Sequence, residues 1–449
     1  MEVCTVGGYE EVGKNMTAVK IGEDVIIFDA GVFLPPLIKL QEEEHRQQAY
    51  SVKKLRNIEA IPNDLILDKL GWTNKVKAIV ISHAHLDHVG GLPYLADRYP
   101  NATIFGTPFT LEVLNSILED EKITLRNKIQ KVEADSQCMI NKKTGLKLEF
   151  VRTTHSTIQC VFGALHSKEG VFFYALDFKF DNFPTLGQPP NYKRLKELGK
   201  SGVKTLVVDS LYSGTDRRTA SERIARNLLE DALSYVRDRK SALFVTTFSS
   251  HIARLKSIVE FGKRTNREIV FVGRSLNKYV NAADKVGMCP FKGKIRMLKY
   301  RRQVDSFLKQ VQKDRGRYLV VCTGHQAEPG SILDRIVKGQ TGFHLKKSDH
   351  VIFSSSVIPV EINLRAREKM DRKLGKMGVR VQTDIHVSGH GGREDLRDLV
   401  EMLKPDHIIP AHGSQEQEKP MIDLATTELG YKAGKTAHLA KNGDVIKIK

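Results

Sequence analysis

Short runs of β-branched and other apolar residues recur along the chain, and helical patterns lie between them. Several runs are almost entirely apolar, as expected for strands that are covered on both faces. The clearest helical pattern spans Thr219 to Arg239 and opens with Thr219-Ala-Ser-Glu222, which has the form of a capping box. Strands that alternate with helices predict an α/β fold. The predicted strands are Val25–Phe28, Val76–Ser82, Val171–Ala175, Leu206–Val208, Ala242–Thr246, Ile269–Val272, Tyr318–Val321, Val351–Ser354 and His407–Pro410.

The excess of positive charge is confined to one internal block. The chain has 71 Lys and Arg against 53 Asp and Glu, a formal net charge of +18. Residues 211–373 contain 34 of the basic and 16 of the acidic residues, and the rest of the chain contains 37 of each. Solubility does not require such segregation, whereas a polyanionic partner does, because cations that neutralise phosphates gain affinity by releasing counterions. We therefore expect nucleic acid, or another phosphate-rich ligand, as a partner.

The same block has its own succession of strands and helices between Thr205 and Ser356, which is typical of a parallel sheet. We expect residues 1–210 and 374–449 to form one domain, and residues 211–373 to form a second, inserted domain. No run of 18 uncharged apolar residues occurs, so we expect no membrane span. The start, Met1-Glu2-Val3-Cys4, does not resemble a signal peptide, and five scattered cysteines without a CxxC pair favour the cytoplasm.

Four potential metal ligands lie within six residues, directly after the predicted strand Val76–Ser82. They are His83, His85, Asp87 and His88. Zinc binds imidazole nitrogen and carboxylate oxygen at about 2.0–2.2 Å, and four such costly groups at a strand end have no packing role. The cluster therefore predicts metal binding. A second metal would need ligands from elsewhere, and His155, Asp177 and His412 also lie at or after predicted strands, although none of them would indicate a metal alone.

These residues resemble the signature of the metallo-β-lactamase superfamily. Four of its motifs are matched by Asp29, the cluster at 83–88, His155 and Asp177. Three further motifs, those of the β-CASP nuclease branch, resemble Asp209, His390 and His412. The segments Gly7–Met16, Thr323–Pro329 and Phe353–Pro359 narrow the resemblance to the ribonuclease J family, in its shorter archaeal form. The resemblance implies an α/β protein, a metallo-β-lactamase αββα sandwich with an inserted β-CASP α/β domain.

The resemblance also implies two Zn²⁺ per chain and a role for each site residue. One zinc would be held by His83, His85 and His155, the other by Asp87, His88 and His412, and Asp177 would bridge the two. The implied catalytic residues are Asp87, His390, Asp209 and Asp29. Among them His390 would give a proton to the leaving oxygen, Asp209 would orient its ring, and Asp29 would hold a ligand imidazole or the ligand loop.

A further set of residues is expected to bind RNA. The segment 386–390 resembles the family's contact with the RNA 5′ phosphate, and the basic block would hold the strand. The candidates are His386, Val387, Ser388, Gly389, His390, Ser210, Ser354, Ser355, Arg301 and Arg302.

The implied function is zinc-dependent 5′-to-3′ exonucleolysis of single-stranded RNA with a 5′ monophosphate, in RNA decay and processing, by a homodimer. Internal cleavage stays open, and so does the alternative of an RNA 3′-end-processing endonuclease. A small-molecule zinc hydrolase would need no basic insert. A diiron protein of this fold has Glu at position 85, a non-catalytic scaffold loses ligands, and His412 favours RNA over DNA as the substrate.

Overall fold

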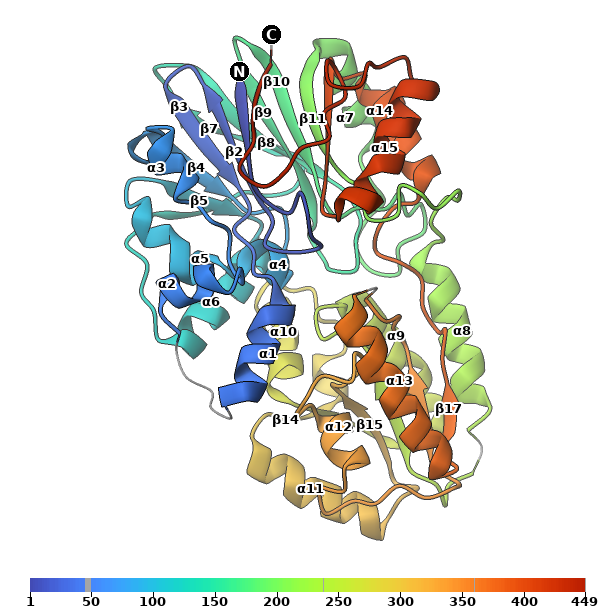
Figure 1. The fold of residues 1–449 in the computed structure, drawn as a ribbon. Coiled ribbons are helices and arrows are strands. Elements are labelled where there is room, and N and C mark those ends of the chain that lie inside the picture. The colour runs from blue at the N-terminus through green and yellow to red at the C-terminus, as the bar shows by residue number, and fades with distance from the viewer. Residues whose placement is uncertain (45–49, 237, 359, 449) are drawn as a thin grey trace. The chain divides into compact units, whose positions relative to one another are not determined.

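The computed structural model describes residues 1–44, 50–236, 238–358 and 360–448. The chain forms two compact units (Figure 1). The first unit comprises Met1–Asn182, Gln188–Thr219 and Gly389–Lys449, and the second comprises Phe183–Gly187 and Ala220–Ser388. Among the described residues, no helix has the length and apolar character needed to cross a membrane.

These limits differ at both ends from the expected insert of 211–373. Residues 374–388 lie with the second unit, because strand β17 (Arg380–Gln382) pairs with strand β16 (His350–Phe353). Thr219 lies with the first unit, because its N–H donates to Asp395 Oδ2 and its hydroxyl to the carbonyl of His390, both at 2.8 Å.

The first unit contains two mixed sheets. One has the order β19-β1-β2-β3-β4-β5-β6 and the other β18-β11-β10-β9-β8-β7. The strands of the first sheet are β1 (Glu2–Gly7), β2 (Met16–Ile21), β3 (Asp24–Phe28), β4 (Val76–Val80), β5 (Thr103–Gly106), β6 (Ile129–Lys131) and β19 (Val445–Lys447). Those of the second are β7 (Ser136–Asn141), β8 (Leu146–Arg152), β9 (Val161–Ser167), β10 (Gly170–Ala175), β11 (Val203–Asp209) and β18 (His407–Ala411).

The two sheets face each other across a shared apolar core. Alternate residues of each strand enter it: Ile26 and Phe28 of β3 lie in the same cluster as Phe172 and Tyr174 of β10. The outer face of the second sheet is covered by α7 (Tyr192–Ser201), α14 (Arg393–Leu403) and α15 (Gln415–Thr427) (Figure 1). Helices that follow strands of the first sheet are α1 (Leu34–Glu44), α2 (Val52–Asn57), α3 (Ile66–Lys69), α4 (Leu86–Val89), α5 (Leu92–Leu95) and α6 (Pro108–Glu121), with short 3₁₀ turns at Thr73–Lys75 and Ala96–Arg98. The predicted αββα sandwich is confirmed.

The second unit contains one all-parallel sheet of order β14-β13-β15-β12-β16-β17. Its remaining strands are β12 (Leu243–Thr246), β13 (Glu268–Val272), β14 (Arg296–Leu298) and β15 (Tyr318–Cys322). Its helices are α8 (Glu222–Ser234), α9 (Ile252–Gly262), α10 (Arg274–Lys285), α11 (Arg301–Lys313), α12 (Ile332–Val337) and α13 (Glu361–Lys376), with 3₁₀ turns at Lys263–Thr265 and Lys292–Lys294. Every strand of a parallel sheet is joined to the next by a crossover, which explains the alternating pattern of the sequence.

All nine predicted strands are present, with ends that shift by a few residues. The predicted helix at 219–239 is shorter: α8 begins at Glu222, and the cap is Ser221, whose side chain accepts from the N–H of Arg223. The capping box predicted from Thr219 does not form, because the Thr219 side chain binds the His390 carbonyl instead.

One carboxyl group in the first unit is buried and forms no ion pair with the residues that the structure describes. Glu418, on α15, has no exposed surface, and neither carboxyl oxygen has a hydrogen-bond partner among the described residues. Burial, together with the carboxylates of Glu11 and Glu10, raises the pKa of Glu418 to about 10. The folded chain therefore keeps a proton that the unfolded chain releases at about pH 4.3.

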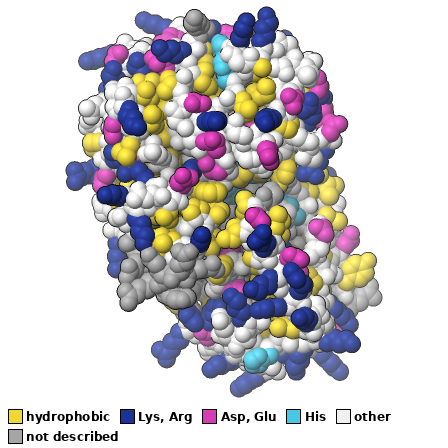
Figure 2. Space-filling view, in the orientation of Figure 1, with side chains coloured by type: hydrophobic (Ala, Val, Ile, Leu, Met, Phe, Trp, Pro, Cys, Tyr) yellow, Lys and Arg dark blue, Asp and Glu magenta, His cyan; other side chains and the backbone are white. Residues whose placement is uncertain are grey.

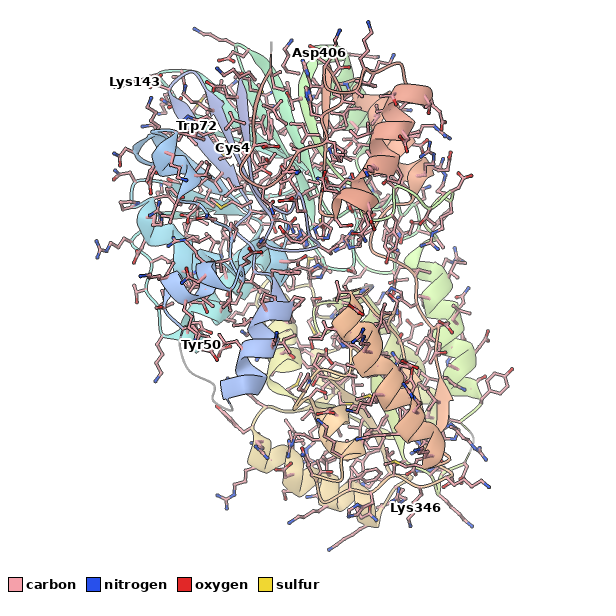
Figure 3. The ribbon with its side chains drawn as sticks, viewed as in Figure 1. Cys4, Tyr50, Trp72, Lys143, Lys346 and Asp406 are labelled. Carbon is pink, nitrogen blue, oxygen red and sulfur yellow. The ribbon has the colours of Figure 1, made fainter. Side chains whose placement is uncertain are left out.

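Replacing this carboxyl with an amide should stabilise the protein at alkaline pH. Because the folded pKa is the higher one, the free energy of unfolding falls as pH rises from the unfolded to the folded pKa. Glu418→Gln removes this loss, so we expect a gain of about 5 kcal/mol at pH 8 and little change at pH 4.5. Thermal unfolding can be followed by the fluorescence of Trp72, the single tryptophan, which is buried in the first unit (Figure 3).

The matched control is Glu416→Gln on the same helix, where the side chain is exposed. Equal stability of Glu418→Gln and the parent protein at pH 8 would contradict a protonated Glu418.

Candidate metal centre

The predicted metal ligands meet at one end of the two sheets of the first unit. In the first sheet β3 and β4 are parallel, so the loop after β3 lies beside the segment 83–88 that follows β4. In the second sheet β10, β11 and β18 are parallel, and β8 has the same direction because β8 and β10 both pair antiparallel with β9. The carboxyl ends of these strands present His155, Asp177 and His412 toward the segment 83–88. This juxtaposition explains why ligands so far apart in sequence converge.

Four of the side chains form what we call the first set: His83, His85, His155 and Asp177. Nδ1 of His85 lies 3.1 Å from Nε2 of His83 and 3.1 Å from Nε2 of His155. Asp177 Oδ2 lies 3.4 Å from His83 Nε2 and 3.5 Å from His155 Nε2.

The second set is Asp87, His88, Asp177 and His412. Nε2 of His88 lies 3.2 Å from Asp177 Oδ2 and 3.6 Å from Asp87 Oδ2. Nε2 of His412 lies 3.6 Å from Asp177 Oδ1 and 4.0 Å from Asp87 Oδ2. Asp177 belongs to both sets and turns one oxygen toward His83 and the other toward His412.

Both sets have the dimensions of a metal site. Ligand atoms at about 2.0–2.1 Å from a tetrahedral metal are about 3.3 Å from one another. The separations given above are 3.1 to 3.5 Å in the first set and 3.2 to 4.0 Å in the second. Asp177 Oδ1 is buried and has no hydrogen-bond partner among the described residues. An unpaired oxygen of this kind destabilises the folded state, and contact with a metal ion would remove that cost. Each set therefore has residues whose chemistry and spacing fit a metal ion.

Hydrogen bonds at the outer edge of the rings direct Nε2 of His83 and His88 into the cluster. His88 Nδ1 donates to Asp29 Oδ2 at 2.7 Å. The hydroxyl of Ser82 donates to the same oxygen at 2.9 Å and faces His83 Nδ1 at 3.0 Å, so it can accept the proton of that ring. Asp29 also accepts from the N–H of Ser82 at 2.8 Å, which holds the start of the ligand segment. Such outer contacts select the tautomer whose free lone pair can reach a metal.

His155 is held by the main chain of a glycine. Its Nδ1 donates to the carbonyl of Gly389 at 2.7 Å, which leaves Nε2 for the first set. A Cβ at position 389 would lie 2.8 Å from Nδ1 and Cε1 of His155 and 2.7 Å from the Ser156 hydroxyl, so the close approach requires glycine.

Three residues of the centre have left-handed backbone conformations: Asp29, Asp177 and His412, with φ of 59°, 54° and 64°. Aspartate tolerates the left-handed conformation, whereas the same conformation costs a histidine roughly 1–2 kcal/mol. Strain of this kind is typical of functional sites, where the surrounding contacts hold it in place.

The electrostatics of the two sets differ. Burial lowers the pKa of His83 to about 3, so this ring is neutral at pH 7 and can bind a metal. Burial also holds the pKa values of His85 and His155 well below their ordinary value. For His88 the effect of burial is outweighed by the carboxylates of Asp177, Asp87 and Asp29, and its pKa lies well above the ordinary value. The second set therefore attracts positive charge, which a metal ion can supply in place of the proton.

A histidine–aspartate pair adjoins both sets. His390 Nδ1 donates to Asp209 Oδ2 at 2.7 Å, and His390 Nε2 lies 3.9 Å from Asp177 Oδ2. The ring stacks on that of His412 with centroids 5.3 Å apart. Burial lowers the pKa of His390, but the carboxylates of Asp209 and Asp177 outweigh it and raise the pKa to about 9. The pair has the form of a proton donor with its orienting carboxylate.

The other RNA candidates lie in several places. Ser210, which follows β11, is buried and its hydroxyl donates to the carbonyl of Val208. Ser354 and Ser355 follow β16 in the second unit and are buried, and Ser354 binds Arg254 and the Ile385 carbonyl. His386, Val387 and Ser388 end the second unit, whereas Gly389 and His390 begin the last part of the first unit. Arg301 and Arg302 are exposed at the start of α11.

Sequence reasoning missed two residues that contact the ligands, Ser82 and Asn15. Ser82 precedes the ligand cluster and could have been found as its first polar residue. Asn15 gives no comparable signal, because it lies 73 residues from His88 and 397 from His412, both of which it contacts.

Family models match most of the chain. The metallo-β-lactamase superfamily model matches residues 9–107, and a β-lactamase superfamily domain matches 67–188. The β-CASP domain of ribonuclease J matches 240–369, and the RNA specificity domain of Zn-dependent metallo-hydrolases matches 377–435.

Similar proteins are found among archaea and bacteria. Ribonuclease J of Pyrococcus abyssi is 40% identical over 100% of this chain and 97% of its own length. Ribonuclease J of Methanocaldococcus jannaschii is 38% identical over 99% of this chain and 98% of its own length. Ribonuclease J 1 of Streptococcus pyogenes is 29% identical over 99% of this chain and 74% of its own length.

A crystal structure of a protein of unknown function from Enterococcus faecalis has the same fold, with a TM-score of 0.66, 17% identity and 99% of each chain covered. The identities to the archaeal proteins extend over the whole chain, and the family models agree with them. The chain therefore belongs to the ribonuclease J family, the metal-dependent ribonucleases of the β-CASP branch of the metallo-β-lactamase superfamily.

Proposed function

We propose that this metal-dependent ribonuclease uses two zinc ions to degrade single-stranded RNA from its 5′ end, with a preference for a 5′ monophosphate. The observation that carries the proposal is the pair of donor sets that share Asp177 and adjoin the His390–Asp209 pair. Zinc is favoured because five imidazoles and two carboxylates supply the nitrogen and oxygen ligands of catalytic zinc sites.

The chain's own residues supply binding, orientation and a proton. Metal ions held by the residues of these sets would supply Lewis-acid stabilisation of a phosphodiester and a water-derived nucleophile at neutral pH. Asp177 faces members of both sets: its Oδ2 lies near His83 and His88, and its Oδ1 lies near His412. Asp209 accepts a hydrogen bond from Nδ1–H of His390 and so orients the ring. The protonated ring then presents its Nε2–H beside Asp177, and this proton can be transferred to the leaving oxygen.

The 5′ end preference is inferred from the segment 386–390. Gly389 in this segment directly binds the ligand His155. We propose that residues of this segment bind the terminal phosphate, and that RNA held in this way is cut one nucleotide at a time from its 5′ end. Internal cleavage of RNA, and an RNA 3′-end-processing role, are the alternatives. We further propose that the enzyme is a cytoplasmic homodimer that acts in RNA decay and processing.

End-labelled RNA tests the proposed direction. The same oligonucleotide, labelled at its 5′-terminal phosphate, should release labelled mononucleotide when it carries a monophosphate and remain largely uncut with a triphosphate. Internal fragments of equal yield from both substrates would contradict the exonuclease and favour the endonuclease.

The second unit is proposed to hold the RNA strand by its phosphates. Figure 2 shows Lys and Arg side chains gathered on the face of this unit that is in view. Arg301 and Arg302 project from the start of α11. With Asp305, Ser306 and Lys309 they line a shallow pocket on its surface, where basic residues outnumber the one acidic residue. Phosphate contacts of this kind bind any sequence and weaken with salt.

Replacing both arginines with alanine should weaken the binding of every RNA sequence to a similar degree. The slope of log K against log salt should fall by about one for each phosphate that the variant no longer neutralises. Filter binding of two unrelated RNAs at several salt concentrations measures this slope. The charge-matched control replaces Lys142 and Lys143 with alanine. Both lysines are exposed on the first unit, and Lys143 is labelled in Figure 3. An unchanged slope in the arginine variant would mean that the pair is only a solvated surface.

A further inference from the structure

A buried asparagine touches three members of the second set. Asn15 lies at the end of the loop between β1 and β2 and has no exposed surface. Its Nδ2 lies 3.0 Å from the main-chain carbonyl of Asp87 and 3.1 Å from Nε2 of His88. Its Oδ1 lies 3.1 Å from Nδ1 of His412.

The chemistry of these contacts fixes the orientation of the amide. A main-chain carbonyl can only accept a hydrogen bond, so the group that faces Asp87 must be the NH₂ of Asn15. The amide oxygen then faces His412 Nδ1, and because that oxygen can only accept, Nδ1 must carry the proton. The lone pair of His412 is left on Nε2, the nitrogen nearest Asp87 and Asp177.

The main chain reinforces this arrangement from both sides. The N–H of Asn15 donates to the same Asp87 carbonyl at 3.0 Å, and the N–H of His412 donates to the carbonyl of Gly8 at 2.6 Å. The loop between β1 and β2 therefore contacts His412 twice, once at its ring and once at its left-handed backbone. A Cβ at Gly31 would lie 1.7 Å from the Asp87 carbonyl and 2.9 Å from the Asn15 nitrogen, so only glycine allows so close an approach.

We propose that Asn15 is a positioning residue that fixes the tautomer and placement of His412 and so determines the affinity of the second set for its metal. This inference rests on the two-metal function proposed above. Asn15 acts through His412 and the Asp87 main chain and needs no contact with the substrate. Contacts of this kind around a metal ligand alter metal affinity by about 10- to 100-fold.

Metal binding can be measured directly, without an activity assay, by equilibrium dialysis against buffered Zn²⁺ followed by elemental analysis. We expect two ions per chain in the parent protein. In Asn15→Ala the weaker-bound ion should have a dissociation constant raised by about 10- to 100-fold, with the other ion unchanged. Asn15→Asp keeps an acceptor opposite His412 Nδ1 but places a carboxylate oxygen where the NH₂ faced the Asp87 carbonyl. Its weaker-bound ion should therefore have a dissociation constant between those of the parent and Asn15→Ala.

The matched control is Asn127→Ala, which removes another buried amide of the same unit. Nδ2 of Asn127 donates to the carbonyls of Tyr99 and Ala102, at 2.8 and 2.9 Å, outside the two sets. This variant should bind both ions like the parent, and Trp72 fluorescence confirms that each variant is folded. Parent-like binding of both ions by Asn15→Ala, or weaker binding of the second ion by Asn15→Asp than by Asn15→Ala, would overturn the inference. A folded parent protein that binds no metal would instead contradict the proposed function.

Discussion

Asp177→Ala is expected to abolish RNA cleavage, with a fall in kcat of at least about 10⁴-fold, while RNA binding stays within a few-fold of the parent. The reason is that Asp177 is the one described residue that belongs to both donor sets. Its loss removes a ligand from each set and leaves their remaining side chains without a common partner. The basic residues of 211–373 are unaffected, so the attraction for phosphates persists. Single-turnover cleavage and filter binding on the same labelled RNA separate the two effects.

The matched control is Asp406→Ala. Asp406 (Figure 3) precedes β18, so it lies at the opposite end of this strand from His412, and it forms an exposed pair with Lys204. Full activity of this variant, together with loss of activity in Asp177→Ala and in His85→Ala, is the expected pattern. Turnover at the parent rate by either ligand variant would refute the two-metal mechanism.

His390→Ala should lower kcat on RNA by about 10²- to 10⁴-fold and leave the metal content unchanged. Asp209→Asn should have a similar effect, because an amide in place of the carboxylate favours the wrong tautomer of His390. The double variant should lose little more than either single variant, since the two residues act as one unit.

A substrate with a good leaving group isolates the proton transfer. The p-nitrophenyl ester of a nucleoside 5′-phosphate releases a stable anion that needs no proton. If His390 is the general acid, His390→Ala should cleave this ester at close to the parent rate while remaining defective on RNA. An equal defect on both substrates would assign His390 to binding or metal positioning instead of proton donation.

The parts of the centre that are local in sequence could be predicted, and those that depend on register could not. His83, His85, Asp87 and His88 are recognisable because one strand end and one short helix carry all four. His155, Asp177 and His412 each look ordinary alone, and only the resemblance to a known family joined them to the cluster. Their convergence depends on the parallel pairing of β10, β11 and β18, which no spacing in the sequence encodes.

The residues that contact the metal ligands from outside were harder to predict from the sequence than the ligands themselves. Asp29 was expected to support a ligand, and it binds His88 and Ser82 directly. Asn15 was not expected at all, because its role arises from a tight loop that approaches two distant segments. The start of α8 was misplaced for a related reason: the Thr219 side chain has a partner in the segment after Gly389, and this partner competes with the local helix cap.

Anomalous diffraction at the zinc edge, from crystals of the purified protein, tests the central claim most directly. We expect two peaks about 3.5–4 Å apart, one bounded by His83, His85 and His155 and the other by Asp87, His88 and His412, with Asp177 in contact with both. Crystals of protein that still cleaves RNA but shows no peak at this cluster, or that place His412 far from residues 83–88, would contradict it.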